Sequence, residues 1–130
     1  MNATKKFAIS LIFLIAASIL SITGLANNKK PSGDINPPGA DLVLYGKINC
    51  PYCDNVKRYL DENNISEKLA IAQKEVSQNE TNKNEFVAKA QICGLDQTKL
   101  VVPMLWDAKN SKCYTGDKAI IDFVGRQTGK

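Results

Sequence analysis

The motif Cys-Pro-Tyr-Cys at residues 50–53 carries the clearest chemical signal in the sequence. It follows an apolar run at 42–45 and opens a helical pattern, so Cys50 falls at or near a helix N-cap, with Pro51 at the first helical position. Because a helix N-terminus carries partial positive charge, it stabilises a thiolate on Cys50. Such settings lower a cysteine pKa from about 8.5 to roughly 3.5–7.5. Cys53, one turn further on, is placed to attack a mixed disulfide on Cys50, so the motif predicts dithiol redox chemistry.

A metal site is the alternative function of the same pair. A Cys-x-x-Cys pair can form half of a structural zinc site. The other two cysteines, Cys93 and Cys113, are 20 residues apart and form no second knuckle, and the chain has no histidine. We therefore predict no resident metal, and keep as an alternative a binding module in which Cys50 and Cys53 hold a soft metal such as copper(I).

Residues 1–26 are typical of a targeting segment. Lys5 and Lys6 precede residues 7–26, a 20-residue run without a charged side chain. A basic start followed by such a run predicts a secretory signal peptide. The run is also long enough to span a bilayer as a hydrophobic helix, so a retained membrane anchor is the alternative to cleavage. Both outcomes place the rest of the chain outside the cytoplasm.

The remaining sequence divides into a flexible linker, residues 27–40, and one globular domain, residues 41–130. The linker holds three prolines and two glycines, and its one large apolar residue is Ile35, so it is expected to bury little. Outside the targeting segment 15 basic residues face 13 acidic ones, a net charge of +2. That balance gives no reason to propose a nucleic-acid partner.

The apolar pattern of the domain predicts alternating strands and helices. Strands are expected at 42–45, 69–72, 100–106 and 113–115, and helices at 52–63, 85–92 and after 116–117. Residues 73–84 are polar and show no clear pattern. The order β-α-β-α-β-β-α predicts an α/β fold with a parallel first unit and a final hairpin, preceded by the hydrophobic helix.

The domain resembles glutaredoxins within the thioredoxin superfamily. The resemblance rests on the Cys-Pro-Tyr-Cys motif after the first strand, on Lys47, on Val102-Pro103, and on Gly116-Asp117 before the last helix. It implies a three-layer, thioredoxin-like fold of the glutaredoxin type, with a cis proline facing the cysteines. It also implies a set of substrate-binding residues that help to hold glutathione in that family: Lys47, Tyr52, Val102, Pro103, Gly116 and Asp117.

The chain also departs from the family pattern. Val101 stands where many glutaredoxins have a threonine, Thr115 replaces the first glycine of a Gly-Gly turn, and Lys118 stands where an acidic residue is common. Export is a further departure, although the same motif occurs in a periplasmic member of the Dsb-type oxidoreductases. The departures concern glutathione binding and leave the dithiol chemistry intact.

The sequence therefore predicts a thiol–disulfide oxidoreductase that acts through Cys50 and Cys53 in the periplasm or another compartment outside the cytoplasm. Residues 7–26 would anchor it in the inner membrane if they are retained. The expected partners are protein or small-molecule disulfides and thiols, together with a membrane redox partner, and the expected state is a monomer. No cofactor is expected. If glutathione takes part, it would act as a co-substrate. A glutathione-linked disulfide reductase is a further alternative.

Cys93 and Cys113 are expected to form a structural disulfide. An exported domain that uses two of four cysteines for redox work is unlikely to leave the other two free in an oxidising compartment. The bridge would join the end of the second helix to the edge strand. Two buried, inert thiols are the alternative.

Overall fold

The computed structural model describes residues 33–130, which form a mixed α/β fold consistent with the thioredoxin-like class. The elements are β1 (Leu42–Gly46), α2 (Pro51–Glu62), a 3₁₀ turn η1 (Ile65–Glu67), β2 (Ile71–Glu75), α3 (Glu80–Ile92), β3 (Met104–Asp107), β4 (Lys112–Thr115) and α4 (Asp117–Thr128). Their order is the predicted one. The hydrophobic helix expected at 7–26 lies outside the described residues. Within residues 33–130, every helix is too short or too polar to cross a membrane.

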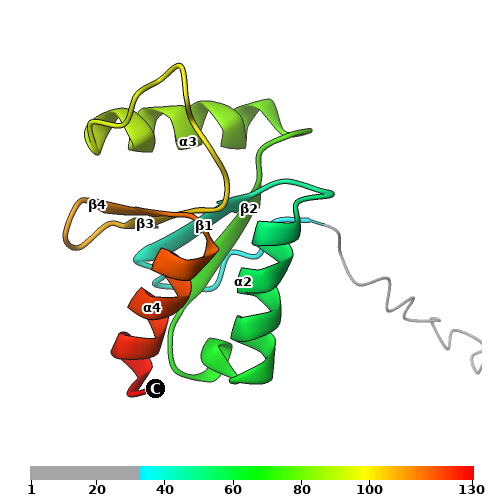
Figure 1. Ribbon diagram of the computed structural model, residues 1–130, viewed down its shortest axis with the longest axis vertical. Coiled ribbons are helices and arrows are strands. Elements are labelled where there is room, and N and C mark those ends of the chain that lie inside the picture. The colour runs from blue at the N-terminus through cyan, green and yellow to red at the C-terminus, as the bar shows by residue number, and fades with distance from the viewer. Residues whose placement is uncertain (1–32) are drawn as a thin grey trace, which may run out of the picture. The chain divides into compact units, whose positions relative to one another are not determined.

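The strands form one four-stranded sheet in the order β2-β1-β3-β4. β1 and β2 are parallel, whereas β3 runs antiparallel to both β1 and β4. Helices α2 and α4 cover one face of this sheet and α3 covers the other, which gives three layers (Figure 1). The carboxyl ends of β1 and β2 therefore lie at the same end of the sheet, and the loop from β1 leads there to Cys50.

Each face of the sheet has its own apolar core. The core under α2 and α4 includes Leu44, Val56, Leu60, Leu105, Ile120, Phe123 and Val124. The core under α3 consists of Tyr45, Val76, Phe86, Ala90, Met104 and Trp106. Trp106, at 5% exposure, belongs to the core under α3.

A polar cluster adds to the packing of α3 on the sheet. The Tyr45 hydroxyl donates to Glu85 Oε1 (2.8 Å), and Lys74 Nζ lies 2.5 Å from Glu85 Oε2. Burial alone would raise the pKa of Glu85, but these hydrogen bonds outweigh it and the pKa of that carboxyl is lowered. Burial, together with the bond to Glu85, raises the pKa of the Tyr45 hydroxyl. The cluster thus holds a carboxylate of α3 against β1 and β2.

Three elements have a boundary that differs from the prediction by more than one residue. β2 covers 71–75 instead of 69–72, and α3 begins at Glu80 instead of Glu85 because Asn79 caps it by accepting from Asn82 N (3.1 Å). β3 begins only at Met104, so residues 100–103, predicted as strand, form a loop.

Part of the predicted flexible linker is held against the sheet. Ile35 and Gln73 exchange two backbone hydrogen bonds of 2.9 and 2.7 Å, and Asp34 accepts one from Glu75 N (3.1 Å). A second Asp34 oxygen accepts from Asn82 Nδ2 (2.7 Å). Residues 34–35 thereby extend the outer edge of β2, because an unpaired strand edge offers backbone partners to any neighbouring chain.

Candidate active site

Cys50 occupies the N-cap of α2, as the sequence predicts. Its backbone is extended (φ −119°, ψ 102°), Pro51 takes the first turn, and Cys50 Sγ accepts a hydrogen bond from Cys53 N (3.2 Å). Such a bond from an orphan N–H of the first helical turn favours negative charge on the sulfur. Cys50 and Cys53 are joined as a disulfide with Cα atoms 5.2 Å apart, and the two residues are 3% and 1% exposed.

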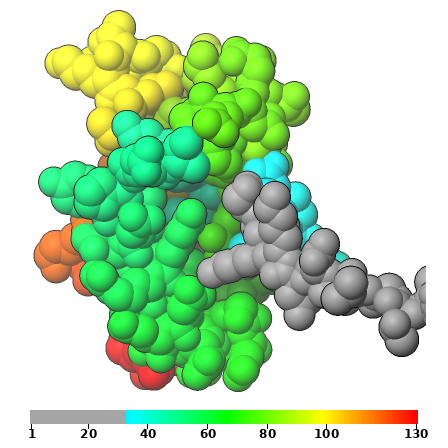
Figure 2. Space-filling view, turned by 90° about the vertical axis from the view of Figure 1, so that its right-hand side faces the viewer, coloured from blue at the N-terminus to red at the C-terminus, as the bar shows by residue number. Residues whose placement is uncertain are grey.

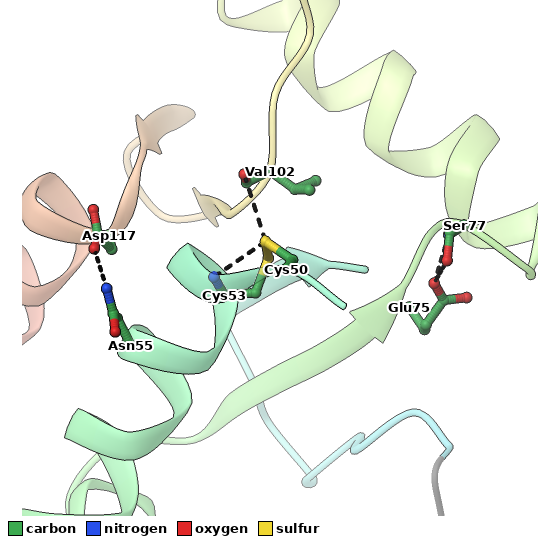
Figure 3. The surroundings of a disulfide bond; sticks show 7 residues. All are labelled: Cys50, Cys53, Asn55, Glu75, Ser77, Val102 and Asp117. Atoms are coloured by element: carbon green, nitrogen blue, oxygen red, sulfur yellow. Dashed lines mark hydrogen bonds between the residues drawn. A yellow bond between two sulfur atoms is a disulfide. The ribbon is translucent and has the colours of Figure 1, made fainter. Parts of the chain in front are cut away.

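The loop before β3 faces the sulfur of Cys50. The Val102 carbonyl oxygen lies 4.0 Å from Cys50 Sγ (Figure 3), and the Val102–Pro103 peptide bond is cis. The Pro103 carbonyl accepts from Gly116 N (2.9 Å). The structure therefore brings Val102, Pro103 and Gly116, which are distant from the motif in sequence, to the start of α2.

A hydrogen bond joins the first turn of α2 to the start of α4. Asn55 Nδ2 donates to Asp117 Oδ2 (2.7 Å; Figure 3), and this bond is the main reason that the pKa of Asp117 is lowered. The N-cap of α4 is Gly116 (φ 84°, ψ 155°), in a backbone conformation that favours glycine, and Asp117 is the first residue of the helix. Asn55 lies one turn after Pro51, and no sequence motif indicated its contact with Asp117.

Lys47 and Tyr52 lie on the surface around the cysteines. Lys47 is an exposed residue of the loop between β1 and α2, and Tyr52 is 62% exposed. Ile48 and Val101, at 49% and 58% exposure, flank the same site from its two loops. No sequence pattern indicated Ile48, because one apolar residue in a loop is not a pattern.

Glu75 is a third residue near the site that the sequence did not indicate. Its carboxylate accepts hydrogen bonds from Ser77 N (2.6 Å), from the Ser77 hydroxyl and from Gln78 N (2.8 Å). Burial would raise the pKa of Glu75, but these bonds, with one from the Ile48 backbone, lower it overall. The carboxylate thus holds the turn that follows β2, through Ser77 (Figure 3) and Gln78.

The second cysteine pair lies on the other face of the sheet. Cys93 caps the C-terminus of α3, Cys113 lies on β4, and the structure joins them as a disulfide with Cα atoms 6.0 Å apart. Both pack against the core under α3. Among residues 33–130, no three His, Cys, Asp or Glu side chains gather as a metal site would require.

Comparison with known proteins supports the resemblance. Comparison with curated protein sequences finds no match. Residues 42–100, from β1 to the loop before β3, match the Glutaredoxin family model. Val102, Pro103, Gly116 and Asp117 lie beyond that match, and the fold brings them to it. The family match, the α/β fold and the redox-type cysteine pair together support a glutaredoxin-type domain with thiol–disulfide oxidoreductase activity.

Proposed function

We propose that this protein is an exported dithiol oxidoreductase in which Cys50 attacks the substrate and Cys53 resolves the intermediate. The observation that carries the proposal is the place of Cys50 Sγ, which accepts from Cys53 N at the start of α2. A hydrogen-bond donor and the positive end of a helix both lower the pKa of a thiol. Cys53, 1% exposed, is the less accessible of the two.

The proposed thiol–disulfide exchange takes place in two steps. The Cys50 thiolate attacks one sulfur of a substrate disulfide, forms a mixed disulfide and releases the other substrate sulfur as a thiolate, which takes up a proton. The Cys53 thiolate then attacks Cys50 Sγ, forms the disulfide of the structure and releases the second substrate thiolate. The substrate gains two electrons and the protein loses two. Run in reverse, the same steps oxidise a substrate dithiol.

The substrate would bind where the loops meet around Cys50. In our proposal the Val102 backbone contacts the substrate opposite Cys50, with Pro103 and Gly116 holding that loop in place. Lys47 and Tyr52 would contact the substrate from the side of α2. Asp117 would play a smaller part, because one oxygen of its carboxylate already accepts a hydrogen bond from Asn55.

Location and partners follow from the N-terminal sequence. Residues 1–26 would export the domain, and residues 7–26, if retained, would anchor it in the inner membrane. We propose a monomer without a resident cofactor, which exchanges electrons with a membrane redox partner and with protein or small-molecule disulfides.

The decisive experiment traps mixed disulfides in cells by acid quenching and alkylation. Cys53→Ser should accumulate adducts through Cys50, whereas Cys50→Ser should not. Equal trapping by both variants would overturn the assignment of the attacking thiol. The same samples separate the alternatives, since a Cys50–glutathione adduct indicates a glutathione-linked reductase. Copper bound to protein purified under reducing conditions would indicate a metal-binding module.

A further inference from the structure

Hydrogen bonds hold the N-terminal side of the domain against the end of β2. Asp34 accepts from Glu75 N (3.1 Å) and from the side chain of Asn82 (2.7 Å), which is 5% exposed. Ile35 adds two backbone bonds to Gln73. We call residues 34–35 the N-terminal clamp. Figure 2 shows the cyan segment that contains it on the surface of the molecule, next to the light-green surface of α3.

The clamp lies at the end of the sheet that carries the cysteines. β1 and β2 are parallel, Gly46 is paired with Glu75, and Gly46 O accepts from Val76 N (2.9 Å). The loop that leaves Gly46 ends at Cys50 four residues later. The chain before Asp34 therefore leaves the domain at the active-site end, and not at the end where β2 begins.

Exposed apolar side chains gather at that same end. Ile48, Tyr52 and Val101 are three of the six large apolar side chains that are exposed within residues 33–130. Lys47 is exposed beside them. Aromatic rings with a polar tip and lysines with long apolar stems suit the boundary between a membrane and water.

We propose that the N-terminal clamp turns the cysteine pair toward the membrane, so that the preferred substrate is a disulfide held in or at that membrane. This inference rests on the proposed export and on retention of residues 7–26 as an anchor. The eight residues 27–34 reach at most roughly 29 Å when fully extended. Without the clamp the tether would run to Asp41, and its 15 residues would reach roughly 54 Å. The clamp thus halves the reach and moves the attachment point to the end of the domain that carries the cysteines.

The first test measures orientation in the full chain, reconstituted in vesicles of phosphatidylethanolamine and phosphatidylglycerol. The photoreactive residue benzoylphenylalanine replaces either Tyr52, at the active-site end, or Lys68, which precedes β2 at the opposite end. We expect several-fold more lipid adduct from position 52. Equal adducts from both positions, or more from position 68, would overturn the proposed orientation.

The second test measures substrate choice with one disulfide peptide, either attached to a lipid anchor in the vesicles or free in solution. Dithiothreitol regenerates the Cys50–Cys53 dithiol in both assays. Asp34→Ala/Ile35→Pro, which removes three of the four clamp hydrogen bonds, should lower the rate on the anchored peptide several-fold. The rate on the free peptide should not change, which also shows that the variant is folded. Asp96→Ala, in an exposed loop, serves as the control variant and should change neither rate.

The outcomes separate this inference from the function beneath it. An unchanged ratio of the two rates in the clamp variant would overturn the role of the clamp alone. A full chain that does not sediment with membranes would refute the anchoring and this inference together. The dithiol chemistry would stand in both cases, because the free peptide tests it independently.

Discussion

The two cysteine pairs of this protein form the same bond in opposite settings. Cys50 and Cys53 lie three residues apart in the first turn of α2, and both are almost fully buried. Cys93 and Cys113 lie 20 residues apart, join the end of α3 to an edge strand, and are partly exposed. Exposure alone would make the second pair the reactive one, so the reactivity must have another source.

The difference lies in how well the fold holds each pair of cysteines together after its disulfide is reduced. The helix holds Cys50 and Cys53 one turn apart, and Cys53 N donates to Cys50 Sγ while the two sulfurs are bonded. We therefore expect reduction of this pair to leave the fold in place. Reduction of Cys93–Cys113 instead frees the link between two elements, and the loop between them includes Val102 and Pro103. We therefore expect Cys50–Cys53 to open and re-form during exchange, and Cys93–Cys113 to stay closed.

The largest effect should come from Cys50→Ser, which we expect to abolish disulfide exchange because no other thiol faces the Val102 loop. Reduction of insulin or of a disulfide peptide by dithiothreitol measures this loss. Cys93→Ala/Cys113→Ala is the matched control and should keep near wild-type exchange at a temperature where it is folded. A loss of exchange in that control as deep as in Cys50→Ser would erase the distinction between the pairs.

The same double variant should show the second largest effect, on stability. In the wild type, the Cys93–Cys113 disulfide closes a loop with a sequence separation of 20 residues. Its removal should lower the free energy of unfolding by about 3 kcal/mol in the chain-entropy model. Denaturant unfolding followed by circular dichroism measures the change. Cys50→Ala/Cys53→Ala, which opens a much shorter loop, should lose less. The reverse ranking would contradict the structural role of Cys93–Cys113.

A redox titration should separate the two bonds within one molecule. The helix start stabilises the reduced form of Cys50, whereas folding stabilises the oxidised form of Cys93–Cys113. We therefore expect Cys50–Cys53 to open at the less reducing potential, by at least about 30 mV, or a tenfold difference in equilibrium constant. Alkylation and peptide mapping across a glutathione or dithiothreitol series would show it. Simultaneous opening of both bonds would contradict the comparison.

The smallest expected effect concerns the bond between Asn55 and Asp117, which ties the start of α2 to α4. Asn55→Ala should be less stable than wild type at neutral pH. Because the folded pKa of Asp117 lies below its ordinary value of 3.8, the bond contributes fully above that pH and is lost as the pH falls through the lower folded pKa. Denaturant unfolding from pH 7 to pH 2 should show the gap narrow only in acid, and Asn55→Asp is the charge-repelling companion variant. A gap that persists at pH 2 would mean that the bond is not the cause.

Local sequence rules predicted the order of the elements and the place of Cys50, because both depend on neighbours in the chain. A strand, a proline in the first turn and an apolar spacing define α2 without reference to the rest of the domain.

Where the prediction was wrong, a distant partner decides the structure. The buried side of α3 opens with Asn82, a polar residue that an apolar pattern passes over, and its partners are Asp34 and the Glu75 carbonyl. Residues 100–103 look like a strand, yet they form the loop that faces Cys50. Asn55 and Asp117, 62 residues apart, meet only once α2 and α4 are packed.

The position of Trp106 has an optical consequence. It is the one tryptophan of the chain, it is paired with Cys113 across β3 and β4, and Lys89 Nζ lies 5.2 Å from the centre of its ring. Its side chain belongs to the α3 core, on the opposite face from α2. Intrinsic tryptophan emission should therefore follow the α3 layer and the Cys93–Cys113 link, and should respond weakly to events at Cys50. The protein carries a natural fluorescent probe of its scaffold, and a probe of its catalytic turn would have to be introduced.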